Sequence, residues 1–250
     1  MGTAYSLPVP GDAFGVRRPA FASRAAALVT GLLLLAAAFF AAPLRAQERR
    51  LDPVDEAAKD ASWTSFKKRA LAAIEKRDQK FVLSILDRNV RTGLDGGRGI
   101  AEFRKQWELE SGESPLWREL AAVLVLPAAY HRPDKGRLEL CVPYVAVRWP
   151  QDLDAFAGGA LIAKDVLVKS APSSASGTVA TLAYNMVEVT NWEVNDRAAD
   201  MPQKWVRIRL QSGFGYVPEE QIRSPVEHAA CFVKGEAGWR LTGFGPGTGT

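Results

Sequence analysis

Hydrophobic and polar positions follow two different periods along this chain. Between residues 61 and 127, apolar side chains recur every three or four positions, which predicts amphipathic helices. The clearest helix starts at Asp60 or Ser62, either of which can cap it. Its apolar face consists of Trp63, Phe66, Ala70 and Ile74. Further helices are predicted at residues 81–86, at residues 100–109 and from Ser114 to Pro127.

From residue 138 onward the pattern changes to short β-branched and apolar runs. Strands are predicted at residues 161–168, 178–182, 186–192, 205–210 and 214–217. Turns rich in glycine, serine or proline separate several of these runs. Five short strands so close together are typical of a small barrel or sandwich. Residues 219–222 fit a single helical turn, and Glu219 and Glu220 are most simply solvated there.

The first 46 residues have the pattern of a signal peptide. A region with several arginines precedes an apolar run from Ala25 to Ala42, and the small residue Ala46 follows. We expect cleavage after Ala46, which makes the protein periplasmic or secreted. The alternative is an uncleaved membrane anchor, because the run just reaches spanning length. Residues 47–60 are polar and charged, and they predict a flexible tether.

More strands flank the central set. Residues 138–142 and 143–147 have β character, and residues 226–244 predict a hairpin. A lone hairpin is not stable, so we expect this one to join the strand around Cys141. The two cysteines of an exported chain, Cys141 and Cys231, suggest a disulfide between these segments. Two buried free thiols are the alternative.

Charge and motifs exclude several classes of function. The whole chain carries a net charge of +4, but the residues after Ala46 hold 28 basic and 27 acidic side chains. Such a balance provides no electrostatic surface for nucleic acid. The glycine-rich residues 91–99 lack the motif of a phosphate loop. The two histidines, His131 and His228, form neither a zinc pattern nor a catalytic pair with cysteine. We therefore expect no catalytic residues, no metal and no cofactor.

The central strands resemble the bacterial SH3-like (SH3b) family. The resemblance is carried, in order, by Leu167–Ser173, by the pair Val179 and Leu182, and by Val187–Val189, Trp205–Ile208 and Gly213–Val217. Lys169 stands where that family usually has arginine. The resemblance implies an SH3-like barrel at residues 158–224 that binds peptides in an aromatic groove. The candidate ligand-binding residues are then Tyr184, Trp192, Trp205 and Tyr216, with Trp192 as the first choice and core packing as the alternative for Trp205 and Tyr216.

The remaining parts, residues 61–157 and 225–247, predict a domain of helices plus a small antiparallel sheet. The fold class is therefore α+β, with the SH3-like barrel inserted. Helices followed by curved strands are also similar to the cone-shaped nuclear-transport-factor-like fold. In that fold a cavity can serve a small-ligand carrier or an enzyme.

We expect a non-catalytic exported protein whose SH3-like domain mediates binding in the cell envelope. Its partner would be a cell-wall peptide or an envelope protein, and it would contact the membrane only if the signal segment is uncleaved. The alternatives are a small-ligand carrier or enzyme that uses a cone cavity, and a purely structural insert. A deep polar pocket favours the carrier or enzyme, whereas a filled cone favours the binding protein.

Overall fold

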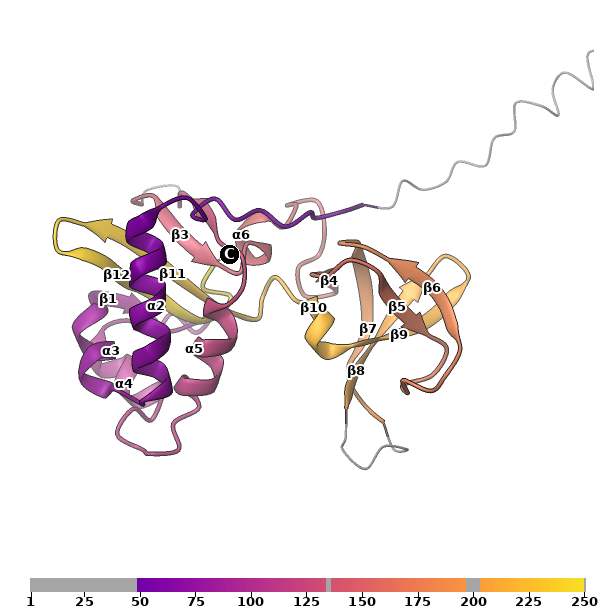
Figure 1. Ribbon diagram of the computed structural model, residues 1–250, viewed down its shortest axis with the longest axis horizontal. Coiled ribbons are helices and arrows are strands. Elements are labelled where there is room, and N and C mark those ends of the chain that lie inside the picture. The colour runs from indigo at the N-terminus through magenta and orange to yellow at the C-terminus, as the bar shows by residue number, and fades with distance from the viewer. Residues whose placement is uncertain (1–48, 134–135, 197–202, 250) are drawn as a thin grey trace, which may run out of the picture. The chain divides into compact units, whose positions relative to one another are not determined.

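The computed structural model describes residues 49–133, 136–196 and 203–249 (Figure 1). The expected signal peptide, residues 1–46, lies outside the described residues. Within the described ranges, no helix has the length and hydropathy needed to cross a membrane. The chain from Glu48 onward forms one compact unit that contains two β-sheets.

The helices come from the first half of this unit. They are α2 (Ala61–Glu75), α3 (Gln79–Ile85), α4 (Ile100–Gln106), α5 (Leu116–Leu124) and α6 (Val145–Arg148). The α2 helix begins as predicted, because the Asp60 carboxylate accepts hydrogen bonds from the backbone N–H groups of Ser62 and Trp63. The α5 helix begins one residue later than predicted, with Pro115 rather than Ser114 at its cap position, and Ser114 Oγ accepts a hydrogen bond from Leu116 N over 3.3 Å.

The first sheet has five strands in the order β1-β12-β11-β3-β2. Its strands are β1 (Leu86–Arg91), β2 (Ala129–His131), β3 (Glu139–Val142), β11 (His228–Gly235) and β12 (Gly238–Pro246). The pairs are antiparallel except for β1 and β12, which run parallel. The sheet is therefore mixed rather than purely antiparallel as predicted, because β1 adds an edge strand that the sequence pattern did not show.

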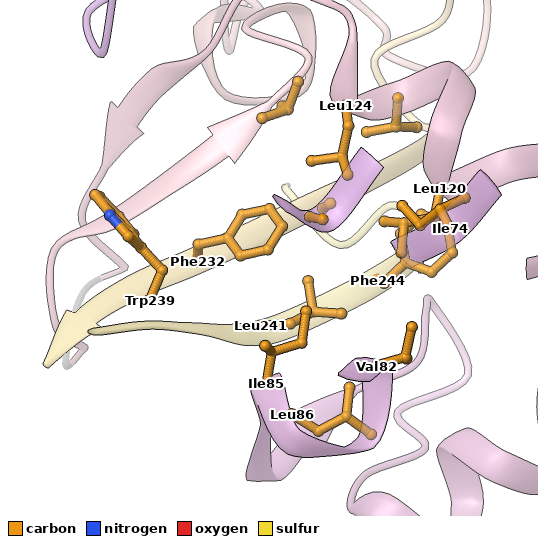
Figure 2. Packing of buried hydrophobic residues seen from close by; sticks show 14 of the residues in the cluster. Ile74, Val82, Ile85, Leu86, Leu120, Leu124, Phe232, Trp239, Leu241 and Phe244 are labelled. Carbon is orange, nitrogen blue, oxygen red and sulfur yellow. The ribbon is translucent and has the colours of Figure 1, made fainter. Parts of the chain in front are cut away.

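The helices α2 to α5 and the first sheet enclose the larger core (Figure 2). Phe232, Leu241 and Phe244 of the C-terminal hairpin meet side chains of α2, α3 and α5 there. The rings of Trp63 and Phe232 have centroids 5.1 Å apart, and Trp107 stacks on Phe244 at 4.6 Å. Large side chains therefore fill the space between these helices and the sheet.

A disulfide ties the C-terminal hairpin to β3. Cys141 and Cys231 are direct partners in the antiparallel register and are bonded, with their Cα atoms 4.1 Å apart. Both residues are fully buried. The structure confirms the predicted disulfide and the predicted pairing of the hairpin with the strand around Cys141.

The second sheet has seven antiparallel strands in the order β10-β4-β7-β8-β9-β5-β6. Its strands are β4 (Gly158–Leu161), β5 (Val166–Lys169), β6 (Thr178–Leu182), β7 (Met186–Asn195), β8 (Lys204–Leu210), β9 (Gly213–Pro218) and β10 (Ile222–Arg223). The predicted helical turn is present as a 3-10 helix at Glu219–Gln221. Figure 1 shows the sheet curled, but no pairing within the described ranges joins β6 to β10. The predicted closed barrel is therefore not confirmed.

Two predicted strands differ in the structure. The apolar run 161–168 is divided between β4 and β5, because Asp165 adopts a positive φ of 53° in a turn between them. The segment after Pro143 forms the short helix α6 instead of a strand, and Arg148 N donates to Tyr144 O over 2.9 Å. Proline has no N–H to give to a strand ladder, which favours this change of direction.

The segment predicted as a flexible tether is instead packed from Arg49 onward. Met186 N donates to Arg49 O, and Leu51 N donates to Tyr184 O, both over 2.8 Å. The Tyr144 hydroxyl donates to Leu51 O over 2.9 Å, which joins this segment to the start of α6. Ala57 is fully buried, so the stretch contributes to the fold of the unit.

Replacing both cysteines by alanine (C141A with C231A) should lower the free energy of unfolding by roughly 4–5 kcal/mol in the chain-entropy model. The reason is that the bond closes a loop across a sequence separation of 90. Denaturant unfolding of the oxidised and variant proteins measures the difference. A loss below about 1 kcal/mol would contradict this role for the bond.

Candidate functional site

A polar cleft of about 640 Å³ lies beside α5, and we refer to it as the junction cleft. Side chains from three separated segments line it: α5 and the residues after it, the start of β8, and residues 219–228. Four carboxylates face three cations there. The carboxylates belong to Glu119, Glu219, Glu220 and Glu227, and the cations to Arg118, Lys204 and Arg223.

Some of these charges are paired within the cleft wall. Arg118 Nη2 lies 2.6 Å from Glu119 Oε1, and Gln203 Nε2 donates to Glu220 Oε1 over 3.3 Å. Arg223 uses Nη1 to donate to two backbone carbonyl oxygens, those of Ile222 at 3.0 Å and Glu219 at 3.4 Å. These bonds hold the guanidinium in place without neutralising it.

Two titratable groups lie deeper in the cleft wall. Glu227 Oε2 accepts a hydrogen bond from Ser224 N over 3.2 Å. Burial raises the pKa of Glu227, and the positive charge of Arg223 opposes that rise. Burial also lowers the pKa of His228, while Glu119, whose Oε2 lies 3.6 Å from His228 Nδ1, opposes that change. Both groups therefore favour their neutral forms more than they would in water.

Sequence reasoning missed this cleft. Glu219 and Glu220 were expected to be solvated in a turn, and His228 was assigned no role. In the structure Glu220 is exposed, whereas Glu219 and His228 are half-buried, and all three line the cleft. The only local feature of the sequence that could indicate the cleft is the density of charged residues from 219 to 228. A solvated turn has the same feature, so it does not distinguish the two.

A second concave region is apolar and lies on the second sheet. Two hollows, of about 270 Å³ and 300 Å³, share Met186, Val187 and Glu188. Trp149 and Leu153 line the first hollow, and Leu182 and Leu210 line the second. We refer to the two hollows together as the apolar groove.

An exposed aromatic side chain lies next to this groove in the sequence. Phe156 is 69% exposed, and its neighbours Asp154 and Ala157 both line the first hollow. Contact surfaces are marked by contiguous apolar patches rather than by single side chains, so Phe156 is of interest only together with the apolar hollow that its chain neighbours line. The sequence pattern did not single out Phe156, because it lies in a loop between two elements.

The four aromatic candidates from the sequence are not brought together. Trp205 is 1% exposed and belongs to the interior. Trp192 is half-buried and packs against the core of the second sheet. Tyr184 and Tyr216 are also half-buried, and the Arg50 guanidinium lies 5.8 Å from the Tyr184 ring. None of the four lines the junction cleft or the apolar groove.

One group of potential metal ligands occurs among the described residues. Glu139, Cys141 and Cys231 have ligand atoms within 4.8 Å of one another. Both sulfurs are bonded to each other, and Glu139 forms a two-point ion pair with Arg91 at 2.7 Å and 3.1 Å. These partners occupy the ligand atoms, so the group is a structural cluster.

Comparison of the chain with protein-family models, curated proteins and solved structures found no match.

Replacing Glu227 by glutamine should stabilise the protein above the pKa of the Glu227 carboxyl and have less effect in acid. Because this pKa is raised, the native state binds the proton more tightly than the unfolded state does. Wild-type stability should therefore fall as the pH rises from about 4.5 through the folded-state pKa, and the variant should lack this fall. Urea unfolding at pH 4 and pH 7.5 measures the difference. Glu236→Gln, in the exposed hairpin turn, is the control. A pH-independent effect of Glu227→Gln would contradict the assignment.

Proposed function

We propose that this is an exported, non-catalytic protein whose SH3-like second sheet binds an extended peptide of the cell envelope. The order of its motifs supports the proposal, because they fall on successive elements of one antiparallel sheet. Leu167–Ser173 covers β5 and the following loop, Trp205–Ile208 lies in β8, and Gly213–Val217 lies in β9.

The apolar groove carries the proposal. An extended peptide directs alternate side chains to the same face, so two adjacent hollows can each accept one apolar side chain. Val187 and Glu188 belong to both hollows and would lie beneath the peptide backbone. Phe156 would then supply the rigid aromatic contact that peptide sites commonly use.

The rim of the groove offers exchangeable charges. Arg49 pairs with Asp152 at 2.7 Å beside the first hollow, and Arg209 pairs with Glu188 at 2.8 Å beside the second. All four side chains are substantially exposed, so these ion pairs contribute little to stability. Acidic or basic groups of a peptide could replace either partner at small cost.

A carrier or enzyme with a cone cavity receives less support. Phe103, Leu120, Leu124, Phe232 and Phe244 are each less than 2% exposed between the helices and the first sheet. Such packing fills the space that a cone cavity would need. A purely structural second sheet is the remaining alternative, and a binding assay separates it from the proposal.

Replacing Phe156 by alanine should reduce retention of the protein on purified peptidoglycan by about tenfold or more, as expected when an aromatic side chain that contacts the ligand is truncated. The unfolding midpoint should not change, because the side chain is 69% exposed. Leu94 is 58% exposed and follows β1 of the first sheet. Leu94→Ala should therefore leave retention unchanged.

Trp192→Ala tests the aromatic candidate that the family resemblance implies. Some loss of stability is expected because Trp192 packs against the core of the second sheet, so retention is compared at equal folded concentration. If the wild-type protein is not retained on peptidoglycan, the cell-wall proposal is wrong. Retention that survives both Phe156→Ala and Trp192→Ala would favour the structural alternative.

A further inference from the structure

The junction cleft is separate from the apolar groove. Lys204 lines the cleft at the start of β8, whereas Arg209 lines the groove near the end of the same strand. Five residues of extended chain span about 16 Å. A ligand in one site therefore does not need the other, and the two sites can be tested independently.

One part of the cleft is suited to a carboxylate. Arg223 is positioned by the bonds from Nη1 to two backbone carbonyl oxygens. Among the described residues, the Nε and Nη2 atoms of Arg223 form no hydrogen bond, and Lys204 has no ion-pair partner. A guanidinium fixed in this way retains a pair of donors for a two-point bond to a carboxylate.

Another part of the cleft is suited to an ammonium group. Among the described residues, the Glu227 carboxylate accepts one hydrogen bond, from the backbone N–H of Ser224, and forms no ion pair. Burial raises the pKa of Glu227 although the positive charge of Arg223 opposes the rise, which is consistent with an incompletely balanced carboxylate. A ligand ammonium would provide the missing counter-charge.

The apolar part of the cleft limits what else the ligand can carry. Aliphatic surface in the cleft comes from α5 and the turn after it, from Ala122, Val123 and Leu126. The volume of about 640 Å³ lies in the range of small-ligand sites. A ligand with one charge sign only would leave either the guanidinium or the Glu227 carboxylate desolvated without a partner.

We propose that the junction cleft binds a small zwitterion, namely a free amino acid or a dipeptide. The ligand carboxylate pairs with Arg223 and Lys204, the ligand ammonium pairs with Glu227, and an aliphatic side chain packs on the α5 surface. Binding of this ligand at the junction cleft does not depend on binding at the apolar groove.

Calorimetric titration with three alanine dipeptides tests the pairing of each charge. Ala-Ala carries both charges, its N-acetyl form lacks the ammonium, and its C-terminal amide lacks the carboxylate. Ala-Ala should bind, and each blocked form should bind at least about tenfold more weakly, since each loses a charge-assisted hydrogen bond.

Variants then assign each charge to its partner through double-mutant cycles. Glu227→Gln should weaken the binding of Ala-Ala. It should remove the preference for Ala-Ala over the N-acetyl form but keep the preference over the amide. Arg223→Gln should remove the preference for Ala-Ala over the amide but keep the preference over the N-acetyl form. Lys204→Gln replaces Arg223→Gln if that variant does not fold. Circular dichroism verifies the fold of each variant.

The matched controls remove the same charges elsewhere. Glu236→Gln and Lys164→Gln, both at exposed turn positions, should leave the affinity for Ala-Ala unchanged, as should Phe156→Ala in the groove region. Equal affinity for the three dipeptides, no binding of Ala-Ala at millimolar concentration, or no effect of Glu227→Gln and Arg223→Gln would overturn the proposal.

Discussion

The return of the C-terminal hairpin to the first sheet is the constraint on which the rest of the structure depends. The β11 strand lies between β3 and β12, and the helices α2 to α5 pack on the sheet that this pairing joins together. Phe232 and Phe244 arrive from the far end of the chain to fill the centre of that core. The disulfide between Cys141 and Cys231 fixes the register at the middle of the sheet.

The same return creates the junction cleft. The chain passes from β10 to β11 through a short connection that holds Ser224 and Glu227, and the connection brings the 3-10 helix close to α5. Glu227 is half-buried in this connection, where its Oε2 accepts a hydrogen bond from the backbone N–H of Ser224. The charges of the cleft are thus positioned by the architecture of the whole unit.

Helices with a cap and an apolar face could be predicted from the sequence, as α2 shows with Asp60 and its buried aromatic residues. Strands with alternating pattern and the disulfide were also predictable. The β1 strand was not, because only Leu86 and Val90 are buried in it and its charged residues hide the pattern. The junction cleft could not be predicted either, since its walls come from segments about 100 positions apart and no local motif joins them.

The insertion of the second sheet has a further physical consequence. The chain leaves the first sheet after α6 and rejoins it at β11, so the whole second sheet lies within the covalent ring that Cys141 and Cys231 close. A single backbone cut anywhere in that sheet would therefore leave the two fragments chemically attached. The protein could be nicked by a protease in this region without either piece diffusing away.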